Sequence, residues 1–211
     1  MNGCSRPPLD LPADQIITSW LPGAFQAASQ RPPTGGPAVR LTLSGQNGGE
    51  WDLHANEESL VVTARDPRLR RGMQDNNPDI WLRQNVPDFL ALFRDDPDLP
   101  ALLTPEVGMM DVLYVDERRA TLLAQIDGRF RFEIEGRRRR RWAIDVAFGP
   151  SGMRAGYPRS TVRVDSRTCE ELARGGIAPL QALLAGRLKI EGDRALVMQV
   201  VMLVGSIRRD S

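Results

Sequence analysis

The chain has 211 residues, of which 41% are hydrophobic and 26% are charged, and its formal net charge is +1. This composition is typical of a globular protein with one large core or two small ones, and it excludes a general nucleic-acid binder, which needs a basic excess. Two cysteines are too few for a disulfide framework, and no apolar run reaches the roughly 20 residues that cross a bilayer. The N-terminal residues contain no signal-like stretch, so we expect a cytoplasmic protein.

The first predicted elements are a helix and a hairpin. Apolar residues around positions 16–28 predict the helix, and alternating apolar residues at 39–43 and 51–53 predict two strands that are joined by a glycine-containing loop. The single histidine, His54, alternates with Leu53 and is interpreted as a surface strand residue.

A third strand and a capped helix follow. The strand begins near Trp81, and Asn85 or Asp88 is positioned to cap a helix with apolar residues at 89, 92 and 93. In the second half of the chain, alternation at 130–134 and 142–148 predicts two further strands.

The last elements are mostly helical. Asp165 or Ser166 is expected to cap a helix that carries Cys169 and Leu172, and residues 180–184 form a short apolar stripe. A strand at 188–190 is expected to turn at Gly192 into the apolar segment 195–204, which we expect to be buried on several sides or to face a cavity.

The two halves share an order of features. Gly45 and Gly136 are separated by 91 residues, as are Trp51 and Trp142, and further matches follow in the same order. These pair Pro78 with Pro158, residues 99–103 with 180–184, and residues 113–120 with 188–195. The ordered run of matches predicts a tandem internal repeat.

The second copy resembles the sterol carrier protein type two family. The resemblance rests on the strand at 130–134, on Trp142-Ala-Ile-Asp-Val146, and on the closing segment 182–195 with its two glycines. The first copy departs from the pattern at 104–110, and it has Glu117 where the second copy has Gly192.

The resemblance implies an α+β fold, in which helices cover one face of a curved, mainly antiparallel sheet and leave an apolar tunnel. We expect a divergent first unit at 14–126, a second unit at 127–206, and tails at 1–13 and 207–211. The segment 118–126 would close the first unit and also open the second.

A search for chemical machinery yields no catalytic residue. A metal site or a catalytic triad would have to use the single His54, and no nucleophile elbow or phosphate loop is present. Cys169 lies on a helix stripe and is interpreted as a packed core residue. We therefore expect no catalytic residue, no metal and no cofactor.

Five consecutive arginines form the most conspicuous local motif: Arg137, Arg138, Arg139, Arg140 and Arg141. They fall in the second predicted hairpin, where a solvated loop is one interpretation. The second interpretation is that they contact anionic lipid head groups or a coenzyme A phosphate, and the third is that they contact nucleic acid.

The resemblance implies non-covalent binding or carriage of a hydrophobic small molecule, such as a sterol, a fatty acyl chain or an acyl-CoA, with transient contact to anionic membranes. An enzyme of the cyclase or isomerase type, acting on a hydrophobic intermediate, is the alternative, and a scaffold with a filled core is a third class. Trp142 is expected either to pack in the core or to line the cavity. The residues expected to line the cavity are Phe132, Trp142, Leu172, Leu183, Leu184, Val197, Val200 and Val201.

Overall fold

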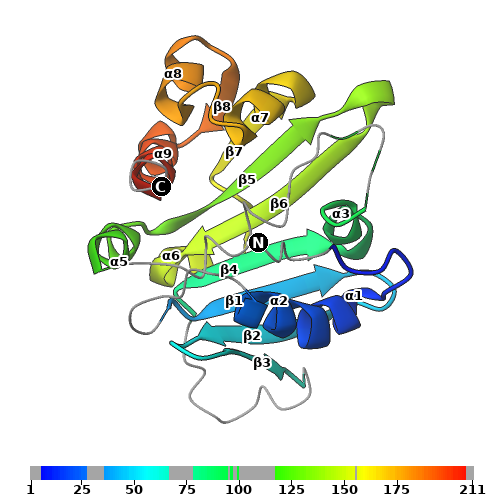
Figure 1. The fold of residues 1–211 in the computed structure, drawn as a ribbon. Helices are drawn as coiled ribbons and strands as arrows, with labels where there is room; N and C mark the ends of the chain where they lie inside the picture. Colours follow the sequence, from blue (N-terminus) through cyan, green and yellow to red (C-terminus); the bar gives the residue numbers. More distant parts are fainter. Residues whose placement is uncertain are drawn as a thin grey trace. The chain divides into compact units, whose positions relative to one another are not determined.

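The computed structural model describes residues 6–27, 36–66, 78–94, 96, 99, 117–154 and 156–207. Among these, the residues up to Arg94 form one compact unit, called unit 1 here. Asp96, Leu99 and the residues from Glu117 onward form unit 2. Figure 1 shows that both units combine strands with helices, so the predicted α+β class is confirmed. The expected boundary after residue 126 stays a prediction.

Unit 1 begins with three short helical segments and continues with four strands in the hydrogen-bonded order β3-β2-β1-β4. Its elements are α1 (Ala13–Gln15), the π-helix η1 (Ile16–Trp20), α2 (Leu21–Ala27), β1 (Val39–Ser44), β2 (Gly49–Ala55), β3 (Leu60–Ala64), β4 (Ile80–Asn85) and α3 (Val86–Ala91). β1 pairs antiparallel with β2 and parallel with β4, and β2 pairs antiparallel with β3. The predicted helix near residue 16 is thus confirmed, although part of it has the wider π geometry.

Unit 2 contains four strands in the order β6-β5-β7-β8. Its elements are α5 (Glu117–Ala124), β5 (Gly128–Glu135), the short 3₁₀ turn η3 (Arg137–Arg139), β6 (Arg141–Phe148), α6 (Gly149–Met153), β7 (Ser160–Asp165), α7 (Ser166–Ala173), α8 (Pro179–Leu184), β8 (Leu188–Gly192) and α9 (Arg194–Ile207). β5 pairs antiparallel with β6 and parallel with β7, and β7 pairs antiparallel with β8.

Within each unit a hairpin is followed by a parallel strand and a capped helix. The parallel registers correspond, because Val39 lies opposite Ile80 and Phe130 lies opposite Ser160. The caps also correspond. The side chain of Asn85 accepts a hydrogen bond from the backbone N–H of Asp88, and Asp165 accepts one from the N–H of Thr168. Of the cap candidates, Asn85 and Asp165 are therefore the residues used.

The two tryptophans matched in sequence occupy different register positions. Trp51 lies opposite Leu41, whereas Trp142 lies opposite Ile134, the counterpart of Leu43 at the spacing of 91 residues. Because a shift of two residues keeps a side chain on the same face of a strand, both tryptophans remain buried. The other sequence matches, within 99–103 and 113–120, lie largely outside the described residues.

Two glycines in unit 2 allow neighbouring segments of the chain to pack closely against the backbone. A Cβ atom at Gly128 would lie 2.8 Å from a methyl group of Leu196, so this glycine lets α9 pack against β5. Gly192 has φ +91°, and a Cβ atom there would lie 2.1 Å from the carbonyl oxygen of Arg159. Gly192 therefore forms the predicted turn into α9, in a conformation that favours glycine.

Candidate functional site

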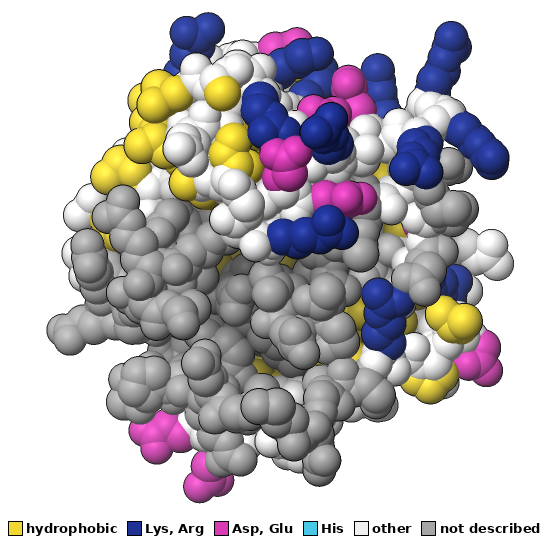
Figure 2. Space-filling view, turned by 45° about the horizontal axis from the view of Figure 1, so that its top comes forward, with side chains coloured by type: hydrophobic (Ala, Val, Ile, Leu, Met, Phe, Trp, Pro, Cys, Tyr) yellow, Lys and Arg dark blue, Asp and Glu magenta, His cyan; other side chains and the backbone are white. Residues whose placement is uncertain are grey.

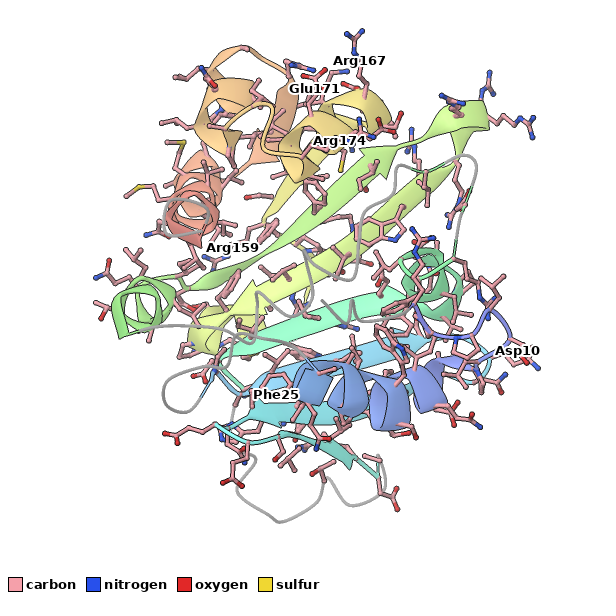
Figure 3. All side chains as sticks on the ribbon, in the orientation of Figure 1. Asp10, Phe25, Arg159, Arg167, Glu171 and Arg174 are labelled. Carbon is pink, nitrogen blue, oxygen red and sulfur yellow. The ribbon has the colours of Figure 1, made fainter. Side chains whose placement is uncertain are left out.

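The apolar face of the unit 1 strands is completely covered. Its side chains are at most 8% exposed: Val39, Leu41, Leu43, Trp51, Leu53, Ile80 and Leu82. Figure 1 shows η1 and α2 lying across these strands, and Ile16, Ile17, Leu21 and Phe25 from these helices are at most 2% exposed. Phe25 lies between its helix and the strands (Figure 3). This part of unit 1 is a filled core.

The corresponding face of unit 2 is only partly covered. Phe130 and Ile134 are buried at the two ends of the β5 pattern, but Phe132 between them is partly exposed. On the antiparallel neighbour β6, Ile144 lies opposite Phe132 and is also partly exposed, as is Val146. Because all of these side chains point to the same face, the partly exposed residues are neighbours on one apolar face that the described helices do not bury fully.

The helices of unit 2 pack mainly over the other strands. α7 and α9 contact β5 and β7, and α8 contacts β8 and α9. Along α9, Leu196 and Val197 are buried, whereas Val200 and Val201, one turn later on the same side, are partly exposed. The inward side of α9 is therefore buried near its N-terminus and partly exposed farther along the helix.

The structure divides the residues expected to line a cavity into three groups. Trp142 and Val197 are buried, and Leu184 is 79% exposed on the outer surface. The remaining predicted residues are partly exposed: Phe132, Leu172, Leu183, Val200 and Val201. These five residues lie on connected elements of unit 2, because α7 and α9 both contact β5, and α8 contacts both α7 and α9.

The sequence interpretation missed Ile144 and Val146, which extend the uncovered surface onto β6. Both belong to the alternating pattern that predicted this strand, but alternation predicts only which side chains share a face. Whether a helix lies over that face depends on contacts between distant segments.

The opposite face of the strands in each unit carries ion pairs. Arg40 binds Asp52 across β1 and β2 through Nε and Oδ1 at 2.7 Å and through Nη2 and Oδ2 at 3.4 Å. Arg131 binds Asp145 across β5 and β6 with the same atoms, at 2.7 and 3.2 Å. Burial raises the pKa of Asp52, but hydrogen bonds from Arg40 and Arg65 outweigh it and hold the pKa below the usual value.

This face of unit 2 continues across β7 and β8. Arg163 binds Glu133 with Nε and Oε2 at 2.8 Å, and it also binds Glu191. Alternating charges thus cross all four strands, so this face of unit 2 is the polar one and is oriented toward water.

The five arginines occupy the tip of the β5–β6 hairpin. Arg137, Arg138, Arg139 and Arg141 are exposed, and Arg140 lies with Nε 3.5 Å from Oδ2 of Asp96. Figure 2 shows basic side chains extending at the upper right, where this tip lies. The predicted hairpin loop is confirmed.

The tip has an unusual backbone. Arg138 and Arg139 have φ values of 50° and 62°, in the left-handed region where asparagine or glycine is preferred. Two arginines in these positions cost conformational energy and place like charges together. The turn geometry does not require arginine, which favours a role for these side chains outside the fold.

A buried arginine, which the sequence interpretation also missed, holds the connection between β6 and β7. Arg129 is 4% exposed and donates hydrogen bonds to the carbonyl oxygens of Gly152, Arg154 and Gly156 at 2.7–3.0 Å. Asp127 accepts a hydrogen bond from the N–H of Ser151, and hydrogen bonds from Ser151 lower the pKa of Asp127. These contacts fix the connection between β6 and β7.

His54 is exposed on β2, as predicted. Cys169 is buried on α7, as expected for a packed core residue. Within the described ranges, no helix has both the length and the apolar character that a membrane span requires.

Comparison with known proteins finds a match to a family model in the second half of the chain. Residues 110–205 match the SCP-2 sterol transfer family. This match supports lipid binding or transfer in general. The match covers a single segment, so the tandem repeat predicted from the sequence is not shown by it.

One curated relative and several solved structures are similar to this chain. Hydroxysteroid dehydrogenase-like protein 2 of Xenopus tropicalis is 27% identical over 84 residues, which are 38% of this chain and 20% of that protein. The chain thus spans about a fifth of that relative's length.

Similar solved structures include the sterol carrier protein domain 2 of Helicoverpa armigera (TM-score 0.32, 18% identity, 42% of this chain and 74% of that chain). Sterol Carrier Protein 2 from Yarrowia lipolytica has a TM-score of 0.30 and 16% identity, over 43% of this chain and 73% of that chain. Sterol Carrier Protein 2 Like 2 from Aedes aegypti has a TM-score of 0.29 and 22% identity, over 44% of this chain and 95% of that chain.

Proposed function

We propose that unit 2 binds a hydrophobic small molecule non-covalently on the uncovered apolar surface of β5 and β6. The observation that carries the proposal is the partial exposure of Phe132, Ile144 and Val146 at positions whose counterparts in unit 1 are buried. Apolar side chains facing the inside of a layered fold are normally covered, and an uncovered patch of this kind marks a binding surface.

The apolar part of the ligand would lie between this surface and the partly exposed side of α9. Phe132 and Ile144 would contact it from the strands, and Val200 and Val201 from the helix, with Leu172 and Leu183 completing the wall. Burial of an acyl chain or a sterol body contributes about 0.8 kcal/mol per CH₂ group. This term alone supplies the driving force, so the site requires no chemical step.

The arginine tip would receive the polar end of the ligand or an anionic membrane. Gly136, at the base of the tip, lies four positions after Phe132, a distance of about 13 Å at roughly 3.3 Å per residue. An acyl chain of ordinary length therefore reaches from the apolar surface to the arginines. Fatty acyl, acyl-CoA and phospholipid ligands fit this arrangement, and a sterol would use the apolar surface alone.

Unit 1 is proposed to be a divergent copy with a filled core. The parallel strand registers, the helix caps at Asn85 and Asp165, and the Arg40–Asp52 and Arg131–Asp145 pairs all support an origin by duplication. In this proposal, unit 1 supports the binding unit and has no ligand of its own.

The experiment is a titration of delipidated protein with a fluorescent fatty acyl probe. We expect saturable binding at micromolar concentration, and Val200→Arg should weaken it at least about tenfold, because a charge in the apolar wall carries a large desolvation cost. Val61→Arg is the matched control, since Val61 is 48% exposed on β3 of unit 1. If folded wild-type protein shows no saturable binding of acyl or sterol probes, the proposal fails.

A further inference from the structure

The outermost strand of unit 1, β3, has an open edge. It is last in the strand order of this unit, and in the described part of the chain it pairs with β2 alone (Figure 1). Hydrogen bonds at its two ends fix the direction of its backbone groups. Ser59 accepts a hydrogen bond from the N–H of Asn56, and the N–H of Arg65 donates to the carbonyl oxygen of Glu50. The backbone groups of Ser59 and Arg65 therefore face β2.

The alternation of an antiparallel strand then fixes the direction of the other backbone groups of β3. Three residues direct their N–H and C=O groups away from β2: Leu60, Val62 and Ala64. No hydrogen bond joins these outward groups to any residue that the structure describes. Such a row of open donors and acceptors is a template on which a further strand can pair.

The outermost strand of unit 2 is protected in a way that β3 is not. β8 has the same alternation of buried and exposed residues as β3, and its exposed residues include Lys189 and Glu191. Charged side chains on an edge strand discourage pairing with other chains. The corresponding positions of β3 carry Val61, which is 48% exposed, and Thr63, which is also exposed. β3 contains no charged residue, no proline and no glycine, so its sequence does not block a further strand.

We infer that β3 pairs antiparallel with β3 of a second copy of the chain, about a two-fold axis at Val62. In this register Val62 faces Val62 of the second copy, and Leu60 faces Ala64 on both sides of the axis, which gives about six backbone hydrogen bonds. Val61 then lies opposite Thr63 of the second copy. Pairs of β-branched residues at opposite positions stabilise a sheet.

A second copy fits this edge because the contact is complementary to itself. Every pair within the strand is uncharged, so two copies bring no like charges together there. Arg65, at the end of the strand, is directed into its own unit, where its side chain lies 3.1 Å from Glu50 and 2.6 Å from Asp52.

The contact has a defined length. In the same register Glu58 of one copy and Asp66 of the other would face each other just outside β3, and like charges at opposite positions disfavour pairing. Pairing is thus confined to Leu60–Ala64. A contact this short predicts a reversible dimer that is half-formed at roughly 10–100 µM chain. The inference does not depend on ligand binding by unit 2.

The test is sedimentation velocity of the full chain between about 5 and 200 µM, where the wild type should shift from monomer to dimer. Val61→Lys/Thr63→Lys places like charges at opposite positions and should raise the dissociation constant at least about tenfold, and Val61→Glu/Thr63→Glu should do the same. An equimolar mixture of the two variants should dimerise again, because each lysine then faces a glutamate. Tyr157→Lys is the matched control, since Tyr157 is 96% exposed outside β3, and it should behave like the wild type.

Amide hydrogen exchange of the wild type gives a second measurement that needs no substitution. A rise in concentration should slow exchange at Leu60, Val62 and Ala64, whose N–H groups face the second copy, and should leave Leu188 and Ile190 of β8 unchanged. A wild-type chain that is monomeric at about 200 µM would overturn the inference. A dimer that the lysine variant retains in full would also overturn it, as would a mixture of the two variants that stays monomeric.

Discussion

The apolar faces of the two units differ in what covers them, although the strands that form them are arranged alike. In unit 1, η1 and α2 lie over the strands, and Phe25 and its neighbours fill the space. In unit 2, α7 and α9 lie over β5 and β7, while Phe132 and Ile144 stay partly exposed. A similar strand arrangement thus gives a closed core in one unit and an accessible apolar surface in the other.

From this difference we propose that the helices decide which unit can bind a hydrophobic ligand. The polar faces share one feature, because the Arg40–Asp52 and Arg131–Asp145 pairs join the same atoms across equivalent strands. In this proposal, binding depends on the helices that cover a common strand arrangement, so substitutions in the two units should separate stability from binding.

The largest expected effect comes from cutting the chain. A fragment of residues 127–211 lacks α5, which packs against α9, and should be insoluble or molten, because the loss is comparable with a domain's whole stability of roughly 5–15 kcal/mol. The full chain should unfold in one thermal transition. A fragment of residues 117–211, which keeps α5, is the matched comparison. A sharp transition of the 127–211 fragment would show that α5 is dispensable and that the copies are independent.

The second-largest effect is a difference in the stability lost when a phenylalanine is truncated in each unit. Phe25→Ala in unit 1 should lower the free energy of unfolding by about 3–5 kcal/mol, because it leaves a cavity in a filled core. Phe132→Ala should cost less than half of that, roughly 1–2 kcal/mol, because its side chain is already partly exposed. Urea denaturation measures both values. Equal losses would mean that unit 2 is as tightly packed as unit 1 at this position.

The helix caps give a smaller effect with a defined pH dependence. Asp165→Ala should cost about 1 kcal/mol near neutral pH, whereas Asp165→Asn should retain most of the stability, because asparagine serves as the cap at Asn85.

Burial raises the pKa of Asp165, but hydrogen bonds from Thr168 outweigh it and hold the pKa below the usual 3.8. The charged cap therefore stabilises the fold above about pH 4, and this contribution is lost as the pH falls through the lowered pKa. Thermal melts between pH 2 and 7 should show a weaker acid dependence for Asp165→Asn than for the wild type. Identical pH profiles would exclude this role for the carboxylate.

The smallest effect on stability is expected at the arginine tip. Replacing all five arginines, Arg137 to Arg141, with glutamine should change the free energy of unfolding by less than about 0.5 kcal/mol, because exposed charges contribute little. Association with anionic liposomes at low salt should decrease and become less dependent on salt. Unchanged liposome binding would leave the tip as a solvated loop.

Much of the strand and helix pattern follows from the sequence. Alternation at Phe130, Phe132 and Ile134 predicted β5, and the polar residues Asn85 and Asp165 marked the helix starts, because both signals are local. The π-helical turn at 16–20 was not predicted, and neither was the register of Trp51, since each depends on contacts made elsewhere in the fold.

The candidate site was less predictable. Leu41 and Phe132 occupy equivalent places in their patterns, yet one is buried and the other is partly exposed. The difference in burial depends on where η1, α2, α7 and α9 lie over the strands. The sequence pattern of a strand contains no information about the positions of these helices. For the same reason, Leu184 was expected in the cavity wall, although the structure places it on the outer surface of α8.

Photolabelling with a diazirine-bearing fatty acid tests the central claim most directly. After irradiation of the full chain and proteolysis, mass spectrometry should find the label in peptides from β5, β6 and α9 of unit 2, in competition with unlabelled fatty acid. Peptides from β1, β2 and β4 of unit 1 should remain unlabelled, because their apolar face is closed. Competable labelling of the unit 1 strands, or none in unit 2, would contradict the account.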